Sequence, residues 1–312
     1  MKVLITGVLG QDGSYLAEYL LSKGHQVVGI DMARENTLLP SIEYHPGSIA
    51  DLELLTDIIS KCRPEVIYNL GSISHVTRSF DLPEETFAVN LLPVIKMLEI
   101  LRHKQKSARF LQASSSEMFV LESTPPFNEE SLIGPRSPYA VSKTAAYHLV
   151  KVYRQTHGLF ACNAILFNHT SPRHSLDFFI AKIVKGLVEI KKGKLDKLKV
   201  GNLDIEKDWG YAGDYVQAMS LIMAHQQPDD YVIGTGQFIS LKAILEHVLN
   251  KLELSYNKVI EIDPGLIRQN EPKRIYSDPS KIKKVLGWQP EKTIEQVLDM
   301  MIATEMEKQG GK

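Results

Sequence analysis

The chain has 312 residues, of which 44% are hydrophobic, and it carries 36 basic against 37 acidic side chains. A formal charge of −1 excludes the broad basic field of a protein that binds nucleic acid or a membrane surface, so we expect neither partner. No apolar run is long enough to cross a bilayer, and strand-like sequence follows Met1 directly, without the apolar stretch of a signal peptide. Two cysteines without a CxxC spacing predict reduced thiols and no metal site. We therefore expect a cytoplasmic protein.

The first half of the chain alternates short apolar runs with amphipathic stretches. The runs are rich in Val, Ile and Leu and predict buried parallel strands at 2–6, 26–31, 42–46, 65–70, 109–113 and 160–167. The amphipathic stretches predict helices at 14–23, 51–61, 83–103 and 138–157. This succession predicts an α/β fold built on a Rossmann-type doubly wound parallel sheet.

The pattern changes after about residue 170, where longer polar connections join the elements. Helices are predicted at 177–190, 215–225, 241–251 and 294–307, with short strands near residues 199 and 259. We expect a dinucleotide-binding domain over 1–168, which includes the 138–157 helix. Residues 169–312 should form mainly a smaller, discontinuous substrate-binding lobe, parts of which return to the main sheet.

Three glycines follow the first predicted strand and precede a helix. Gly7, Gly10 and Gly13 form a GxxGxxG array, in which glycine lets the backbone approach a pyrophosphate bound at the helix N-terminus. The second predicted strand ends at Asp31, whose carboxylate can accept hydrogen bonds from the adenosine ribose and would repel a 2′-phosphate. Arg34 lies nearby and could host that phosphate. The residues favour NAD as the cofactor, with NADP as the alternative.

A Tyr-x-x-x-Lys spacing places both side chains on one helical face, where the ammonium can stabilise a phenolate that takes a proton from a substrate hydroxyl. The sequence contains three such pairs, Tyr19/Lys23, Tyr139/Lys143 and Tyr147/Lys151. Only Tyr139 and Lys143 begin a helix at the expected carboxyl edge of the sheet, where α/β proteins bind their ligands. They are therefore the predicted catalytic pair.

Three serines and an acid end the fifth predicted strand, at residues 114–117. A serine hydroxyl in this place can donate to a reacting hydroxyl or a developing oxyanion. The carboxylate of Glu117 should lie over the same crevice. Together with the glycine turn and the tyrosine pair, this segment predicts an active site.

With these residues in place, the sequence resembles the GDP-mannose 4,6-dehydratase family of extended short-chain dehydrogenases. The resemblance extends from residue 3 to about residue 290. Its most specific segment is Gln11-Asp12-Gly13-Ser14-Tyr15 in the cofactor loop. Further matching segments lie at 68–76, 112–119, 136–143, 165–173 and 201–210.

The resemblance implies a role for each catalytic residue. Tyr139, assisted by Lys143 and Ser115, would take the C4 hydroxyl proton while the C4 hydride passes to NAD(P). Glu117 would then remove the C5 proton and help to expel the C6 hydroxyl as water, after which the hydride returns to C6.

The resemblance also implies the binding residues. The cofactor would contact Gly7, Gly10, Gln11, Asp12, Gly13, Asp31, Ser48, Ile49, Leu70, Ser72, Tyr139, Lys143 and His169. A GDP-sugar would contact Ser74, Ser116, Asn168, Lys182, Lys207, Arg268 and Glu271. The family also implies a homodimer, in which the helices at 83–103 and 138–157 pair across a two-fold axis.

This chain departs from the family pattern at several positions. A family segment that is rich in arginine and holds NADP is replaced by the shorter connection after Asp31. Ser48 replaces a family acid that contacts adenine, and Glu85 replaces a tyrosine that faces the cofactor. His174 replaces an arginine of the substrate loop. Lys207 replaces another arginine and so loses a planar bidentate donor. These changes put NADP, the family's tetramer and the identity of the sugar in doubt.

Two other functions stay open on the sequence. A 4-keto reductase or epimerase acting on a GDP-sugar would use the same scaffold, but it would need no C5 base at Glu117. A catalytically inactive NAD-binding regulator would need none of Ser115, Tyr139 and Lys143, and their joint presence argues against it.

Overall fold

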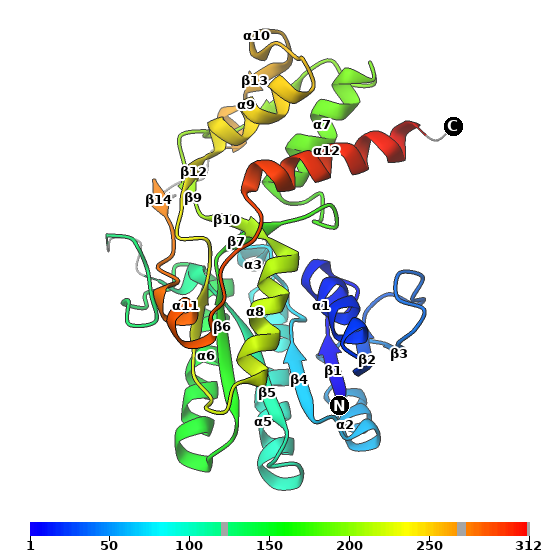
Figure 1. The fold of residues 1–312 in the computed structure, drawn as a ribbon, viewed down its shortest axis with the longest axis vertical. Coiled ribbons are helices and arrows are strands. Elements are labelled where there is room, and N and C mark those ends of the chain that lie inside the picture. Colours follow the sequence, from blue (N-terminus) through cyan, green and yellow to red (C-terminus); the bar gives the residue numbers. More distant parts are fainter. Residues whose placement is uncertain (120–123, 267–272, 311–312) are drawn as a thin grey trace.

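The computed structural model describes residues 1–119, 124–266 and 273–310. Its centre is a seven-stranded sheet in which all paired strands run parallel, in the order β11-β6-β5-β4-β1-β2-β3 (Figure 1). The strands are β1 (Lys2–Thr6), β2 (Gln26–Asp31), β3 (Glu43–Pro46), β4 (Val66–Asn69), β5 (Arg109–Ser115), β6 (Ala161–Leu166) and β11 (Tyr231–Ile233). The chain order reverses at β1, which pairs with β2 on one side and β4 on the other. A ligand crevice is expected at the carboxyl ends of these strands. The predicted doubly wound fold is confirmed.

Helices cover both faces of the sheet (Figure 1). One apolar core lies between the sheet and α1 (Gln11–Ser22), α8 (Ala212–Ala224) and α11 (Ser280–Leu286). A second lies against α2 (Leu52–Cys62), α5 (Leu92–Lys104) and α6 (Pro138–His157), with α3 (Arg78–Asp81) and α4 (Pro83–Asn90) beside α6. Because both faces are covered, the inner strands β1 and β4 are buried along almost their whole length and do not alternate between buried and exposed residues.

A lobe stands over the carboxyl ends of the strands and has an apolar core of its own (Figure 1). Its helices are α7 (Phe179–Lys191), α9 (Leu241–Lys251), α10 (Tyr256–Val259) and α12 (Ile294–Gly310). Its short strands are β8 (Leu198–Val200), β9 (Glu206–Lys207), β12 (Ile239–Ser240), β13 (Ile260–Ile262) and β14 (Arg274–Ile275). At the junction, β7 (Asn168–Thr170) pairs with β10 (Trp209–Tyr211).

The buried carboxylate of Asp208 joins three segments of this lobe. It accepts hydrogen bonds from the N–H groups of Thr235 at 3.0 Å, Gly236 at 3.1 Å and Ser277 at 3.2 Å. A fully buried carboxylate is retained only when such donors satisfy it. This anchor fixes the backbone between Lys207 and Trp209, both of which face the cavity described below.

The predicted single helix over 83–103 is wrong. The structure ends α4 at Asn90 and begins α5 at Leu92, with Leu91 between them at φ −118°. Pro93 explains the break, because within a continuous helix its ring would clash with the carbonyl of Val89. In the first turn of α5 a proline costs nothing, since N–H groups there have no intrahelical acceptor.

Other predicted boundaries move by a few residues. Helix α1 begins at Gln11 rather than residue 14, and β5 continues two residues beyond the predicted end, to Ser115. The sequence analysis missed β7, β10 and β11, each only three residues long. A three-residue strand is too short to show a periodic pattern.

Both cysteines, Cys62 and Cys162, are buried and unbonded. Burial raises the pKa of both thiols, to about 11 and about 12.

In the described part of the chain, no helix is both long and apolar enough to cross a membrane. The same residues contain no cluster of three His, Cys, Asp or Glu side chains that could hold a metal ion.

Candidate active site

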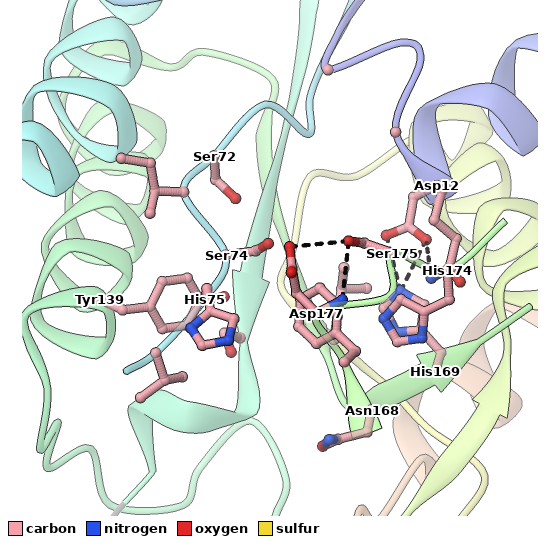
Figure 2. Close-up of a pocket in the computed structure, with 18 of the residues that line it drawn as sticks. Asp12, Ser72, Ser74, His75, Tyr139, Asn168, His169, His174, Ser175 and Asp177 are labelled. Carbon is pink, nitrogen blue, oxygen red and sulfur yellow. Dashed lines mark hydrogen bonds and ion pairs between the residues drawn. The ribbon is translucent and has the colours of Figure 1, made fainter. Parts of the chain in front are cut away.

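A cavity of about 930 Å³ lies between the carboxyl ends of the central strands and the lobe above them. It is lined by every described residue to which the sequence analysis gave a catalytic or binding role. Figure 2 shows one wall with Ser72, Ser74, His75 and Tyr139, and the opposite wall with Asp12, Asn168 and His169. Arg268 and Glu271 lie outside the described residues.

The glycine loop is shaped for close approach of a ligand. Gly7 has φ +67°, and a Cβ there would lie 2.8 Å from the Cα of Gly71. A Cβ on Gly13 would lie 2.1 Å from the carbonyl oxygen of Gly7. Only glycine fits at either position. The loop therefore delivers the first-turn N–H groups of α1 to the cavity, where they can bind the pyrophosphate of a dinucleotide.

The carboxylate of Asp31 lies beside this loop at the end of β2. It accepts hydrogen bonds from the backbone N–H groups of Leu9 at 2.9 Å and Met32 at 2.7 Å. These two donors hold it at the cavity wall, beside the loop that would carry the pyrophosphate. A dinucleotide fits this arrangement, because a carboxylate in this place can accept from the ribose hydroxyls.

Helix α6 places the tyrosine and lysine at the same edge. Ser137 caps the helix by accepting a hydrogen bond from the Ala140 N–H at 3.1 Å, and Pro138 occupies the first turn. Tyr139 and Lys143 follow one turn apart, and the Lys143 Nζ lies 5.8 Å from the centroid of the Tyr139 ring. Both side chains are buried.

Burial shifts the pKa values of the two groups toward their neutral forms. It raises the pKa of Tyr139 to about 12, although a hydrogen bond from the Ser115 hydroxyl lowers it in part. It lowers the pKa of Lys143 to about 8, against an ordinary value of 10.5. Perturbed pKa values of this kind are typical of acid–base residues in catalytic sites.

A chain of buried hydrogen bonds connects Lys143 with the glycine loop. The Lys143 Nζ donates to the carbonyl of Ala113 at 2.9 Å, and the side chain of Gln112 donates to the same carbonyl. Gln112 accepts in turn from Asn69 at 2.7 Å, and Asn69 accepts from the Thr6 hydroxyl at 2.7 Å. The lysine is therefore held by the ends of three adjacent strands.

Glu117 lies directly after β5 in a short 3₁₀ helix, η1 (Ser116–Met118). The Ser115 hydroxyl caps this turn by accepting from the Glu117 N–H at 3.2 Å. Glu117 lines the cavity close enough to Tyr139 to raise the pKa of that phenol. The serine, the acid and the tyrosine can thus act on one small molecule.

The other two Tyr-x-x-x-Lys pairs lie elsewhere. The Lys151 Nζ donates to the Tyr147 hydroxyl at 3.3 Å, but neither side chain lines the cavity. The Lys23 Nζ lies 5.4 Å from the centroid of the Tyr19 ring on α1, and that pair does not line the cavity either. Position on the fold, rather than spacing, separates the three pairs.

Further polar side chains line the cavity from three other elements. Asn168 is on β7, Lys182 on α7 and Lys207 on β9. Two lysines and an amide that line a cavity can bind an anionic group such as a diphosphate.

Several cavity-lining side chains were missed by the sequence analysis. His75 and Phe178 come from opposite walls, and their ring centroids lie 6.1 Å apart. His174 stacks on Phe178 with the centroids 4.5 Å apart. Trp209 lines the wall beside Lys207. His75, His174 and Trp209 belong to segments that the resemblance had matched or noted, so those segments carried a signal for them; nothing in the sequence marked Phe178.

The sequence model of the family described as GDP-mannose 4,6 dehydratase matches residues 4–301 of this chain. The GDP-mannose 4,6-dehydratase of Vibrio cholerae is 36% identical to this chain. The alignment covers 98% of this chain and 94% of that protein. GDP-mannose 4,6 dehydratase 2 of Arabidopsis thaliana is 39% identical over 97% of this chain and 86% of that protein.

The fold also matches solved structures. The dTDP-glucose 4,6-dehydratase DesIV of Streptomyces venezuelae, solved with NAD and TYD bound, superposes with a TM-score of 0.88. The match covers 99% of this chain and 98% of that protein at 22% identity. At this identity the similarity supports the fold alone.

Burial of the Lys143 ammonium should lower the free energy of unfolding of the cofactor-free protein. Because the folded-state pKa of about 8 lies below the ordinary 10.5, the unfolded chain binds more protons between these values, and stability should rise with pH across that window. Lys143→Met should therefore raise the free energy of unfolding at pH 7 by about 2 to 3 kcal/mol and remove the pH dependence. Urea denaturation from pH 7 to pH 10 measures both effects.

Lys151→Met is the matched control, since Lys151 forms the partly exposed pair with Tyr147. It should change stability by less than about 0.5 kcal/mol. If the wild type and the Lys143→Met variant were equally stable at pH 7, burial of the ammonium would not destabilise the fold.

Proposed function

This chain belongs to the GDP-mannose 4,6-dehydratase family, and we propose that it converts GDP-mannose or a related GDP-sugar into the 4-keto-6-deoxy sugar. The observation that carries this proposal is that Glu117 lines the same cavity as Ser115, Tyr139 and Lys143. Oxidation or reduction at C4 alone needs only the last three. An additional carboxylate beside them supports removal of the C5 proton, the step that separates dehydration from C4 reduction or epimerisation.

In the proposed mechanism, this chain's residues move two protons. The phenolic oxygen of Tyr139 takes the proton of the C4 hydroxyl, while Lys143 stabilises the negative charge on that oxygen and Ser115 donates to O4. Glu117 removes the C5 proton, which the new 4-keto group makes acidic, and delivers it to the C6 hydroxyl as this leaves as water. Tyr139 supplies a proton when C5 is protonated again.

A dinucleotide held here would supply the hydride-transfer chemistry, from C4 to C6 of the same sugar. The residues that would hold it are Gly7, Gly10, Gln11, Asp12, Gly13, Asp31, Ser48, Ile49, Leu70, Ser72 and His169, with Tyr139 and Lys143 at the reacting end. No external oxidant or reductant is consumed, so the net change is the loss of one water.

The nucleotide sugar would bind across the junction of the two parts of the chain. Ser74 and Ser116 would contact the sugar. The diphosphate would be bound by Asn168, Lys182 and Lys207. Residues 1–168 would thus form the dinucleotide-binding domain with the catalytic residues, and residues 169–312 mainly a lobe that binds the nucleotide sugar. The buried, unbonded cysteines support function in the cytoplasm, where thiols stay reduced.

We expect Glu117→Gln to separate the first step from the second. The variant should still oxidise C4, because Ser115, Tyr139 and Lys143 are intact, and should accumulate reduced nicotinamide. Dehydration should fall about 100-fold or more. Incubation with GDP-mannose, with mass spectrometry for the loss of water and near-ultraviolet absorbance for the reduced cofactor, measures both.

Tyr139→Phe should abolish both signals, whereas Glu130→Gln, which removes an exposed acid from a loop, should change neither. If wild-type protein supplied with NAD removes no water from GDP-mannose or other GDP-sugars, the dehydratase assignment fails and a reductase or epimerase takes its place.

Asp31 should determine the choice between NAD and NADP. Its carboxylate would lie beside a 2′-phosphate and repel it, so we expect NAD to bind about 100-fold more tightly than NADP. Asp31→Asn should reduce this preference about tenfold, mainly by improving NADP binding. Isothermal titration of the stripped protein with each dinucleotide gives the ratio, with the exposed Glu35→Gln as control. Tighter wild-type binding of NADP would refute the role of Asp31.

Apolar side chains on α5 and α6 support a homodimer. Leu92 is 46% exposed, Val141 40% and Val152 47%, and the two helices lie side by side. We expect the protein to sediment as a dimer and Val152→Glu to shift it to a monomer, because a charge would be buried in the interface. Val285→Glu, at a similarly exposed valine on α11, should leave the dimer intact. A monomeric wild type would contradict this assembly.

A further inference from the structure

The carboxylate of Asp12 lies at the N-terminus of α1, where a bound pyrophosphate requires positive electrostatic potential. Asp12 is in the first turn of α1, whose N–H groups face the cavity and attract anions. Its side chain is only 19% exposed, so water screens its charge weakly. An unpaired carboxylate here would repel the pyrophosphate that the same helix turn is shaped to hold.

His169 pairs with this carboxylate from the opposite side of the junction. Its Nε2 lies 2.9 Å from both carboxylate oxygens of Asp12, and the imidazole is 13% exposed (Figure 2). The pair joins residues that are 157 positions apart and connects the cofactor loop with β7, the strand that carries Asn168. A second hydrogen bond, from the Ser171 hydroxyl to Gln11 at 2.8 Å, crosses the same junction.

The hydrogen bonds of His169 fix its protonation state. Its Nδ1 lies 2.8 Å from the carbonyl oxygen of Phe167, which can only accept, so Nδ1 carries a proton. Its Nε2 faces the Asp12 carboxylate, which also accepts when ionised. Burial opposes both charges, but the mutual attraction outweighs it, raising the pKa of His169 and lowering that of Asp12. The pair is an imidazolium and a carboxylate.

The neighbouring cationic groups compensate Asp12 less directly than His169 does. Burial, together with repulsion by His169, lowers the pKa of His174 to about 4. The Lys143 Nζ donates to the carbonyl of Ala113, and Arg173 forms an ion pair with Glu18 at 2.7 Å. Among the described groups around Asp12, His169 is therefore the one whose charge contacts the carboxylate directly.

We propose that His169 is a charge-compensating and positioning residue for the dinucleotide site, because its imidazolium neutralises Asp12 and lets the pyrophosphate bind at α1. Asp12 in turn holds the imidazolium on the cavity wall and ties the cofactor loop to the strand of the substrate site. The inference rests on the dinucleotide binding of the proposed function, and it does not depend on which sugar reacts.

A double-mutant cycle on NAD affinity tests this role. His169→Asn leaves the Asp12 charge uncompensated and should weaken NAD binding about tenfold or more. Adding Asp12→Asn should recover most of that loss, because the repelling charge is gone, and Asp12→Asn alone completes the cycle. Isothermal titration of the cofactor-stripped proteins gives the four dissociation constants.

Whether Asp12→Asn strengthens or weakens NAD binding in the His169→Asn background distinguishes charge compensation from packing. If His169 acts only by filling space, the double variant should bind NAD as weakly as His169→Asn or more weakly, and that result would overturn the proposal. Circular dichroism and thermal melting show whether each variant folds, and Asp12→Asn/His169→Asn preserves the polar contacts with neutral groups of similar size. His247→Asn is the matched control, because it breaks a His–Asp pair of the same 2.9 Å length on α9 and α12.

The outcomes also distinguish this inference from the proposed function. If the wild type binds NAD but the double variant shows no recovery, only the role of His169 fails. If the wild type binds neither NAD nor NADP, both fail.

Discussion

The parallel direction of all the strands in the central sheet is the constraint on which the rest of this structure depends. It places the carboxyl ends of β1, β2, β4, β5 and β6 at one edge, and the site lies at that edge. Residues far apart in the chain, such as Gly7 and Glu117, therefore line one cavity. Parallel strands also need crossover helices, and one of these, α6, brings Tyr139 and Lys143 back to the edge.

The site concentrates groups that are costly to bury. Tyr139, Lys143, Asp12 and His169 are held in low-dielectric surroundings by particular partners: the Ser115 hydroxyl, the Ala113 carbonyl, and one another. Each arrangement is unfavourable for isolated groups and is tolerated because the rigid strand ends fix the partner. Stability and function therefore oppose each other at this edge of the sheet, as they do at many catalytic sites.

The lobe depends on the sheet for its position and on Asp208 for its internal order. The hydrogen bonds of Asp208 bring together the backbone around residues 208, 235 and 277, so that Lys207 and Trp209 face the cavity. The Asp12–His169 pair and the Gln11–Ser171 bond connect this region with the cofactor loop. The proposed cofactor and substrate sites would thus share one wall, which suits a reaction in which a hydride leaves C4 and returns to C6 of one sugar.

The sequence by itself determined the features that depend on local chemistry. The glycine turn, the acid at the end of β2, the apolar strands and the Ser137-Pro138 helix start each follow from backbone sterics or burial pattern. Similarity to a known family added the proposed role of Glu117. The sequence could not show that Pro93 divides the predicted helix at Leu91, because proline is equally acceptable in a first turn. Nor could spacing choose among three Tyr-x-x-x-Lys pairs or join Asp12 to His169. Those outcomes depend on which side chains meet across the sheet edge, and only the tertiary structure decides which residues share a low-dielectric cavity.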